Sequence, residues 1–365
     1  MKYALIGCGR ISPNHIQAAI NNKLEIVALC DIVEQNMYDL IDKFKLLDNV
    51  ERYTSYEDML KNEELELVAI ATESGKHAKI ALDCIEQGIN VIIEKPIALS
   101  MEDADEIINR ARNKGVLVCV NHQNRFNKAV RKTYSEIEKG HFGKLLHGTA
   151  HILWNRGKQY YEQAKWRGTW EQDGGTLMNQ CIHNIDLLCW MMGAVDEVFA
   201  YTDNLNHDYI EAEDVGLAVI KFKNGGYGMI EGTSYVYPKN LEETLYIFGS
   251  EGTVKLGGKS VNTIEEWNIE KSIENIECVK EKHSENPPNV YGFGHTPLYE
   301  DVINSIINKR EPFVTAEDGK RALEVVLAIY KSAQFGIPIK LPLKEGTTID
   351  FVGRFNDKCV SVGDL

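Results

Sequence analysis

Long apolar runs are missing from this chain of 365 residues. A membrane-spanning helix needs a run of about 18 or more apolar residues, so the sequence predicts that no segment crosses a bilayer. The N-terminus has no small-residue cleavage site, and glycines interrupt its apolar run after a few residues. This pattern is typical of a first β-strand rather than a signal peptide.

Paired cysteines are missing as well, because the chain has no CxxC motif and no dense cysteine framework. We therefore expect reduced, mostly buried thiols in a cytoplasmic protein. Internal repeats and low-complexity tracts are also absent from the sequence. The eight cysteines are Cys8, Cys30, Cys84, Cys119, Cys181, Cys189, Cys278 and Cys359.

The chain also has no excess of positive charge. It contains 40 Lys and Arg residues and 54 Asp and Glu residues, for a formal net charge of −14. Such a surface repels nucleic acid and anionic membranes, and we expect neither as a partner. An anionic substrate would need a local basic pocket. The chain is longer than a single domain with one hydrophobic core usually is. The sequence therefore predicts two domains, residues 1–122 and 123–365.

The first 120 residues alternate strand-like apolar runs with segments of helical periodicity, which indicates a parallel sheet covered by helices. Ser100 and Gly115 are the expected caps of one of these helices. The expected strands are residues 3–7, 26–31, 65–72, 90–94 and 116–121, with a weaker one near Arg52. The expected helices include residues 76–87 and 101–113.

From about Leu145 the pattern changes to longer alternating strands, which predict a largely antiparallel open sheet. The fold class is therefore α/β: an N-terminal Rossmann domain with a parallel sheet, then an α+β domain with a large, mostly antiparallel open sheet. The polar residues 277–288 are expected to form a mobile loop. The expected strands are residues 145–154, 215–222, 226–235 and 244–248, and the expected late helices are residues 297–308 and 316–334.

A glycine-rich turn at Gly7 and Gly9 follows the first strand and precedes a helix, where backbone amides can approach a pyrophosphate. Ser12 stands at the third position of the motif, and a lone GxG also fits an ordinary strand-to-helix turn. Asp31 ends the second strand, 24 residues after Gly7, where a carboxylate can bind the adenosine ribose. No Lys or Arg lies between Asp31 and Asp42 to neutralise a 2′-phosphate, so NAD is favoured over NADP.

Polar residues follow the fourth and fifth strands at the carboxyl edge of the sheet, where ligands of such sheets bind. After the fourth strand these are Thr72, Ser74 and His77, although His77 also fits a residue that merely starts a helix. Pro96 keeps Lys95 extended at the end of the fifth strand. A desolvated lysine can act as the general base of an alcohol oxidation; the alternative is a surface lysine paired with Glu94.

Several motifs in the same order resemble the glucose-fructose oxidoreductase, inositol dehydrogenase and MocA family. They are the GCGRIS turn, the segment Ala71-Thr72-Glu73-Ser74, Glu94-Lys95-Pro96, Asn124-Arg125-Phe126, and Gly174-Gly175 leading to His183 and Asp186. The resemblance implies a dehydrogenase acting on a CH-OH group, with a second domain whose sheet mediates a homodimer or homotetramer.

Further segments resemble the UDP-N-acetylglucosaminuronate 3-dehydrogenases of bacterial polysaccharide and lipopolysaccharide biosynthesis. They are residues 166–170, Met178-Asn179-Gln180 with His183, residues 237–242 and residues 291–295, and the similarity ends near Pro342. This resemblance implies NAD-dependent oxidation of C3 of this sugar nucleotide. The alternatives are another sugar or inositol dehydrogenase, or an NAD-binding sensor without turnover.

The resemblance also implies roles for Lys95, as the catalytic lysine, and for His183, near the reacting hydroxyl. Many family members carry aspartate four residues before that histidine, but here the residue is Asn179, whose amide exchanges no proton at neutral pH. Proton transfer then falls to Lys95 or His183, while Asn179 orients the substrate. His183 also fits a core histidine of an apolar helix, and Asp186 could orient its ring.

Two further sets of contacts are expected. The cofactor-binding residues are Gly7, Gly9, Arg10, Ile11, Asp31, Thr72, Ser74, His77, Glu94, Lys95 and Gln123. The substrate-binding residues are Arg125, Arg156, Trp166, Arg167, Asn179, His183 and Lys239. The aromatic loop of residues 154–170 fits either a lid over the substrate or packing at a subunit contact. No metal is expected, because His151, Cys181 and His183 lack the spacing of zinc ligands.

Overall fold

The structure of the protein, a computed structural model, describes residues 1–47, 49–272 and 274–355. Its contacts divide the chain into two units. The first comprises Met1–Gln123 and Phe293–Lys320, and the second comprises Asn124–Gly292 and Arg321–Leu365. The sequence predicted a single boundary at residue 122, and it gave no sign that residues 293–320 return to the first unit.

The first unit contains a Rossmann sheet whose six strands are all parallel, in the order β3-β2-β1-β4-β5-β6. The central strands are buried on both faces, and for that reason they are continuous apolar runs in the sequence. The predicted parallel sheet is confirmed. Its strands are β1 (Lys2–Ile6), β2 (Glu25–Cys30), β3 (Glu51–Tyr53), β4 (Leu67–Ile70), β5 (Asn90–Ile93) and β6 (Val118–Val120).

Helices alternate with these strands along the chain, and α5 shows why they form. Ser100 caps its first turn by accepting a hydrogen bond from the backbone N of Asp103 at 3.0 Å, and Gly115 ends it in the left-handed conformation at φ 66°. The helices are α1 (Ser12–Asn21), α2 (Glu34–Phe44), α3 (Tyr56–Asn62), α4 (His77–Glu86), α5 (Met101–Lys114) and α10 (His295–Asn308), with the 3₁₀ turn η1 (Ser74–Lys76).

Helix α10 belongs to the first unit because it packs on α1. Its Tyr299 is fully buried, and the Tyr299 hydroxyl lies 2.9 Å from the Tyr3 hydroxyl and 2.7 Å from Nδ1 of His15. These contacts join residues almost three hundred positions apart, which local sequence patterns do not reveal.

The second unit contains an eight-stranded sheet in the order β13-β12-β11-β7-β10-β9-β8-β14. The pair β7 and β10 is parallel and the other neighbours are antiparallel. This confirms the predicted mostly antiparallel sheet. Its strands are β7 (Leu145–Leu153), β8 (Val195–Asp203), β9 (Val215–Phe222), β10 (Tyr227–Thr233), β11 (Glu242–Gly249), β12 (Gly252–Gly257), β13 (Thr263–Ile269) and β14 (Ile339–Lys340).

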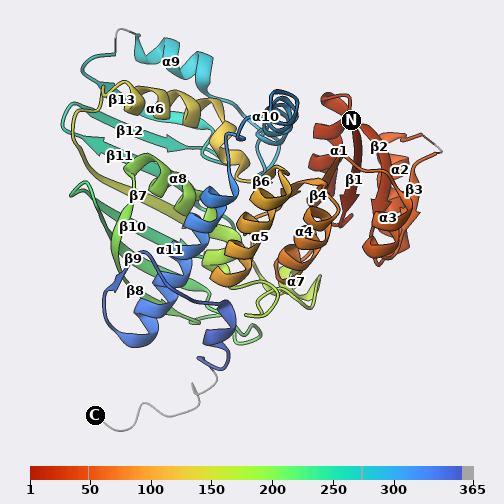
Figure 1. Cartoon of the computed structure of the whole chain (residues 1–365). Coiled ribbons are helices and arrows are strands. Elements are labelled where there is room, and N and C mark those ends of the chain that lie inside the picture. Colours follow the sequence, from red (N-terminus) through yellow and green to blue (C-terminus); the bar gives the residue numbers. More distant parts are fainter. Residues whose placement is uncertain (48, 273, 356–365) are drawn as a thin grey trace. The chain divides into compact units, whose positions relative to one another are not determined.

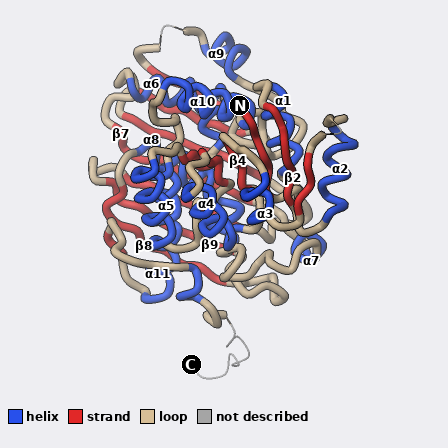
Figure 2. Tube along the Cα trace, turned by 45° about the vertical axis from the view of Figure 1, so that its right-hand side comes forward, coloured by secondary structure: helices blue, strands red, loops and turns tan. Residues whose placement is uncertain are grey.

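Helices α8 and α11 lie over one face of this sheet (Figure 1), and α8 packs directly on β7, β10 and β11. Figure 2 shows these helices in blue against the red strands. The helices of this part are α6 (Lys128–Glu138), α7 (Lys158–Glu162), α8 (Ile182–Met192), α9 (Ile276–His283) and α11 (Ala316–Phe335), with the 3₁₀ turns η2 (Gln123–Phe126) and η4 (Thr348–Phe351) and the π-helix η3 (Leu177–Cys181).

The prediction of a loop at residues 277–288 was wrong for its first half, which forms helix α9. Asn275 caps this helix by accepting a hydrogen bond from the backbone N of Glu277 at 2.8 Å, and Val279 is its buried anchor. A single buried residue in a polar helix gives too weak an apolar period to be recognised in the sequence.

No helix within the described residues is long and apolar enough to cross a membrane. Seven of the cysteines are free thiols, and five of these are buried: Cys8, Cys30, Cys84, Cys119 and Cys181. Cys359 lies outside the described residues. Burial raises the pKa of the Cys30 thiol to about 12, so this thiol is uncharged and unreactive at neutral pH.

Candidate active site

The turn after β1 is built around Gly7, which has a φ of +93°. A Cβ atom at this position would lie 2.5 Å from the carbonyl carbon and oxygen of Ala71. The backbone N of Gly7 donates to the carbonyl oxygen of Cys30 at 2.8 Å. Both the close approach of β4 and the left-handed backbone therefore require glycine.

Gly9 and the start of α1 form the next part of this turn. A Cβ atom at Gly9 would meet no atom within 4 Å, so its backbone faces open space. Helix α1 has no acidic residue in its first turn and no side-chain cap, so its positive dipole end has no anionic side chain of the first turn beside it. Arg10 is exposed and Ile11 half-buried beside this helix start.

The carboxylate of Asp31 is held by three donors of the surrounding backbone and side chains. The backbone N of Cys8 donates to Oδ2 at 2.7 Å, while the backbone N of Val33 and Nδ2 of Asn36 donate to Oδ1 at 2.8 and 3.2 Å. The side chain is thus aimed at the turn and keeps lone pairs for further donors. This geometry suits a ribose with two hydroxyl groups and opposes a 2′-phosphate.

We expect the protein to bind NAD at least about a hundredfold more tightly than NADP, because like charges in contact cost several kcal/mol. Isothermal titration of both cofactors measures this ratio. Asp31→Ser combined with an introduced arginine should lower it, whereas Asp39→Ser, an exposed acid on α2, should leave it unchanged. Equal affinities of the wild type for both cofactors would contradict the role of Asp31.

At the carboxyl edge of the sheet, His77 connects the segments that follow β4 and β5. Its Nδ1 lies 2.7 Å from the carbonyl oxygen of Pro96, and its Nε2 lies 3.2 Å from that of Thr72. Burial lowers the pKa of His77, so the ring is neutral at physiological pH. Both ring nitrogens face the backbone, which favours the structural alternative for His77, while buried Ser74 begins the adjacent turn.

Glu94 lies in a buried hydrogen-bond network rather than on the surface. Its Oε1 accepts from Nε2 of His15 at 3.0 Å and from Nδ2 of Asn121, and Oε2 accepts from the backbone N of Lys95 at 3.3 Å. Burial alone would raise the pKa of Glu94, but His15 and His295 beside it hold the pKa well below its ordinary value. An ionised carboxylate therefore holds the backbone at Lys95.

His15, Glu94 and His295 also form a group of three potential metal ligands within the described part of the chain. Each has a hydrogen-bond partner in the network, since Asn121 contacts both Glu94 and Nε2 of His295, the latter at 3.1 Å. These contacts engage all three side chains without an ion, while Oδ1 of Asn121 has no hydrogen-bond partner among the described residues. The expectation that no metal is bound stays a prediction.

Gln123 ends the strand region of the first unit with an unsatisfied acceptor. Its side chain is 3% exposed, and its Oε1 has no hydrogen-bond partner among the described residues. A buried acceptor of this kind is costly unless a ligand supplies a donor. Together with the Gly7 turn, the open Gly9 and the aimed Asp31, it makes the first unit fit a bound dinucleotide.

In the second unit, the π-helix η3 carries Asn179 and is followed directly by α8, which carries His183. Single π-turns of this kind are frequent at functional sites. His183 is half-buried, whereas Ile182 and Ile185 of the same helix are fully buried. The histidine therefore lies outside the apolar stripe of α8, which disfavours the core-histidine alternative.

Four of the predicted substrate residues lie in one polar cluster, which also contains Tyr160 and Gln180. Oε1 of Gln180 accepts from Nε of Arg156 at 2.9 Å, and its Nε2 donates to the Tyr160 hydroxyl at 2.9 Å and to Oδ1 of Asn179 at 3.1 Å. The guanidinium of Arg167 lies 4.2 Å from the centre of the Tyr160 ring. Trp166 joins the cluster beneath the same guanidinium, at 5.6 Å.

Arg125 lies elsewhere, in a buried ion pair with Asp186. Its Nε and Nη2 donate to the two carboxylate oxygens at 2.7 and 2.5 Å, and both side chains are 3% exposed. The guanidinium also lies 4.7 Å from the Trp190 ring centre. The pair occupies the nitrogen atoms that a bidentate substrate contact would use, and Asp186 uses both oxygens on Arg125. Lys239, the remaining candidate, is exposed after β10.

Sequence reasoning missed Asp173, which is buried next to the polar cluster. One carboxylate oxygen accepts from the amide of Asn179, and the other accepts from the backbone N of Gly168 at 2.7 Å. Asp173 therefore sets which way the Asn179 amide points. The available signal was an acid directly before the Gly174-Gly175 pair, but only the fold shows that it reaches Asn179.

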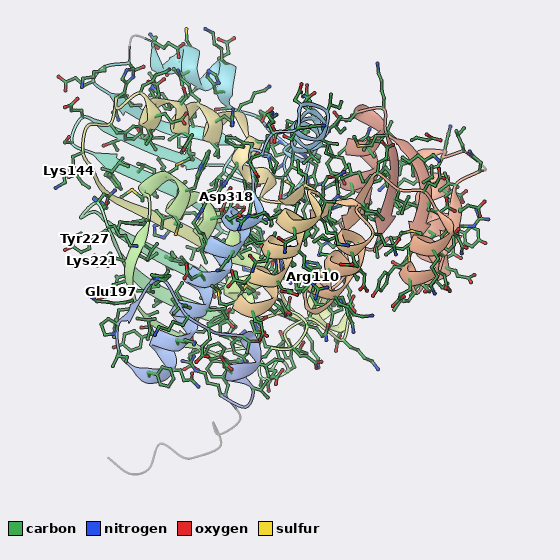
Figure 3. All side chains as sticks on the ribbon, viewed as in Figure 1. Arg110, Lys144, Glu197, Lys221, Tyr227 and Asp318 are labelled. Carbon is green, nitrogen blue, oxygen red and sulfur yellow. The ribbon has the colours of Figure 1, made fainter. Side chains whose placement is uncertain are left out.

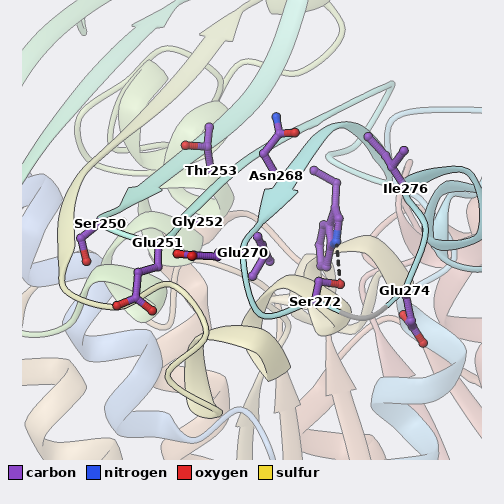
Figure 4. Close-up of a pocket in the computed structure, with 12 residues that line it drawn as sticks. Ser250, Glu251, Gly252, Thr253, Asn268, Glu270, Ser272, Glu274 and Ile276 are labelled. Atoms are coloured by element: carbon purple, nitrogen blue, oxygen red, sulfur yellow. Dashed lines mark hydrogen bonds between the residues drawn. The ribbon is translucent and has the colours of Figure 1, made fainter.

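An open surface pocket of about 560 Å³ lies at the turn between β11 and β12, beside the end of β13 (Figure 4). The carboxylates of Glu251, Glu270 and Glu274 line it, and Nε1 of Trp267 lies 3.5 Å from the Ser272 hydroxyl at its wall. The described residues of the lining include no Lys or Arg to pair with the phosphates of a dinucleotide or the carboxylate of a uronate. This pocket therefore does not suit either ligand.

Comparison with known proteins matches both parts of the chain to one family. Residues 1–122 match the oxidoreductase family (GFO/IDH/MocA), NAD-binding Rossmann fold, and residues 135–341 match the C-terminal alpha/beta domain of that family. The myo-inositol 2-dehydrogenase of Thermotoga maritima is 24% identical over 359 residues, which cover 93% of this chain and 98% of that protein.

Two solved structures are more similar to this chain. The WlbA dehydrogenase of Bordetella pertussis, in complex with NADH and UDP-GlcNAcA, is 36% identical, with a TM-score of 0.87 over 94% of this chain and 98% of that one. The WlbA dehydrogenase of Chromobacterium violaceum, with the same ligands, is 34% identical, with a TM-score of 0.86 over 94% and 96%. The chain therefore belongs to the GFO/IDH/MocA oxidoreductase family, and it is an NAD-dependent dehydrogenase.

Proposed function

We propose that this dehydrogenase oxidises the C3 hydroxyl of UDP-N-acetylglucosaminuronate to the 3-keto sugar nucleotide, a step of bacterial polysaccharide biosynthesis. The observation that carries this proposal is the similarity, above 30% identity over nearly the whole chain, to two dehydrogenases solved with NADH and UDP-GlcNAcA. The inositol dehydrogenase relative is less similar, at 24% identity.

The polar cluster of the second unit supports an anionic substrate. The protein carries a formal net charge of −14, so an anion needs cations gathered at one place. Arg156 and Arg167 both lie over the Tyr160 ring, at 5.3 and 4.2 Å from its centre. Arg156 is further oriented by Oδ1 of Asn240 at 3.2 Å. A substrate carboxylate or diphosphate is the natural ligand of two such guanidinium groups.

In the proposed reaction, NAD held by the first unit would supply the acceptor for the hydride of C3. The hydroxyl proton passes to the amine of Lys95 or to the imidazole of His183, so the carbon loses two electrons and one proton is taken up by the protein. The Glu94 network holds the backbone at Lys95. Asn179 offers the substrate an amide that Asp173 and Gln180 orient, and this amide replaces the acid of many relatives.

Uridine nucleotides test the proposal. We expect UDP-N-acetylglucosaminuronate to exceed UDP-N-acetylglucosamine by about a hundredfold or more in kcat/KM, because the neutral hexose lacks the carboxylate that would pair with Arg156 and Arg167. NADH formation measures both values. Arg156→Met and Arg167→Met should reduce the ratio of the two kcat/KM values. Lys158 is an exposed cation on α7, and Lys158→Met should leave this ratio unchanged.

Two outcomes would contradict the uronate assignment. One is a similar kcat/KM for both nucleotides, and the other is faster oxidation of free myo-inositol than of either. In both cases the protein would keep its place as an NAD-dependent dehydrogenase of the family, with a different sugar or inositol as substrate. The relative from Thermotoga maritima supports that second candidate.

The uncovered face of the large sheet supports a homodimer or homotetramer. Figure 3 shows Glu197, Lys221 and Tyr227 on the side of the sheet away from α8 and α11. Two residues further along the same strands lie apolar cross-strand neighbours, with Phe199 opposite Val219 and Val219 opposite Met229. Val219 is 55% and Tyr227 61% exposed. A contiguous apolar patch of this kind marks a protein contact, and we propose a second copy of the chain as the partner.

Sedimentation velocity tests this contact. We expect the wild type to sediment as a dimer or tetramer and Val219→Asp to shift toward the monomer, because an unpaired charge would be buried in the interface. Ile307→Asp, at a residue of α10 that is 66% exposed, is the matched control and should keep the wild-type state. A monomeric wild type would contradict the proposal.

A further inference from the structure

The segment of residues 343–355 lies beyond the matched family domain, which ends at residue 341, yet it packs into the second unit. Phe351 is fully buried there. The centre of its ring lies 5.5 Å from that of Trp170 and 5.3 Å from that of Tyr330. The Trp170 and Tyr330 rings meet edge to face at 5.1 Å. Phe351 therefore completes a three-ring core with residues of the aromatic loop and α11.

Hydrogen bonds tie this segment to the same two residues. The Thr348 hydroxyl donates to the carbonyl oxygen of Trp170 at 2.6 Å, and Nη1 of Arg354 donates to that of Tyr330 at 3.1 Å. A capping box between Thr347 and Asp350 stabilises the turn η4 that carries Phe351. The segment thus has a defined local structure and defined partners.

Tyr330 connects the ring of Phe351 to the π-helix η3 through hydrogen bonds of its hydroxyl group. Its hydroxyl lies 2.9 Å from the carbonyl oxygen of Gly174 and 2.7 Å from Oε1 of Glu213, and it accepts from the backbone N of Met178 at 3.3 Å. Oε1 of Glu213 also accepts from the backbone N of Leu177 at 2.7 Å. The start of η3, two residues before Asn179, is therefore anchored to the ring that Phe351 contacts.

Trp170 provides a second connection, from residues 343–355 to Asp173. The backbone N of Asp173 donates to the carbonyl oxygen of Thr169 at 3.2 Å, next to the carbonyl that Thr348 holds. The carboxylate of Asp173 then orients the amide of Asn179. Both routes from residues 343–355 end at the same amide.

We propose that residues 343–355 act as a strap that positions Asp173 and Asn179 for the sugar substrate. The proposal rests on the proposed function in so far as Asn179 contacts that substrate. Without the strap, Trp170 loses the rings of Phe351 and Phe355 and its carbonyl loses a donor, so the loop and η3 gain freedom to move. A displacement of about 1 Å at a positioning group can lower the rate about a hundredfold.

Phe351→Ala tests the strap in the full-length protein. We expect KM for the sugar nucleotide to rise and kcat to fall, each by about tenfold or more, while the dissociation constant of NADH stays within twofold. Phe351→Leu, which restores most of the apolar volume, should recover the activity, and Thr348→Val should show a smaller loss of the same kind. Phe335→Ala, at a residue of α11 that is 61% exposed, is the matched control and should behave as the wild type.

Hydrogen exchange of residues 168–181 provides a readout that needs no substrate. The strap predicts that this segment exchanges about tenfold faster in Phe351→Ala and at the wild-type rate in Phe335→Ala. Unchanged exchange, or unchanged KM and kcat alongside a lowered melting temperature, would overturn the proposal. A wild type that oxidises no uridine nucleotide would instead contradict the proposed function, and the exchange rates would still decide on the strap.

Discussion

Lys95→Met is expected to lower kcat at least about a hundredfold, the lower range for a positioned acid–base group. Methionine keeps the length of the apolar stem and removes the amine that receives the hydroxyl proton. The backbone at this position is held by the ionised, buried Glu94, so the strand end should keep its structure. We therefore expect the melting temperature and the affinity for NADH to stay near those of the wild type.

Lys76→Met is the matched control, because Lys76 is an exposed lysine of the turn η1 at the same edge of the sheet. It should retain wild-type turnover in a stopped-flow or steady-state assay of NADH formation. Wild-type rates in Lys95→Met would contradict the proposed role. His183→Asn should lose activity too, and a double variant that is no slower than the worse single variant would show that both groups serve one proton transfer.

Gly7→Ala is expected to destabilise the first unit by about 3 kcal/mol or more, from backbone strain and overpacking together. The added methyl group would lie 2.5 Å from the carbonyl of Ala71, at a φ of +93°. Because β1 and β4 are both central strands of the sheet, neither can shift without disturbing its other neighbour. Chemical denaturation measures the loss, and NAD binding should be lost with it.

Gly9→Ala is the matched control for folding, because its methyl group would meet no atom within 4 Å. We expect the wild-type free energy of unfolding and a weaker affinity for NAD, since this glycine lets the pyrophosphate approach the backbone. A Gly7→Ala protein as stable as the wild type would contradict the turn geometry. Wild-type NAD affinity in Gly9→Ala would contradict the pyrophosphate site.

The elements that the sequence predicted well are those determined by local pattern. β4 and the last three residues of β5 are apolar because both faces of the Rossmann sheet are covered, and α5 carries its start and stop signals at Ser100 and Gly115. The strand β13 and the return of α10 to the first unit were not predicted. The position of α10 depends on partners distant in sequence, such as Tyr3 for Tyr299, whereas β13 pairs with the preceding strand β12.

The same distinction holds for the candidate site. The residues of the Gly7 turn and Asp31 were predicted as cofactor contacts because their spacing is typical of one βαβ unit. The ion pair of Arg125 with Asp186 was not predicted, because an arginine that binds a substrate and one that binds an aspartate look alike in a sequence. Asp173 was not predicted either. Its contact with Asn179 depends on the π-helix that carries Asn179, and the sequence pattern did not predict that π-helix.

Transfer of deuterium from the substrate to the cofactor tests the central claim most directly. UDP-N-acetylglucosaminuronate labelled with deuterium at C3 would be mixed with NAD and an excess of enzyme, and the cofactor extracted after one turnover for mass spectrometry. The account predicts NADH that is heavier by one deuterium and a 3-keto sugar nucleotide without the label. Unlabelled NADH with the deuterium retained on the sugar, or no NADH at all, would contradict it.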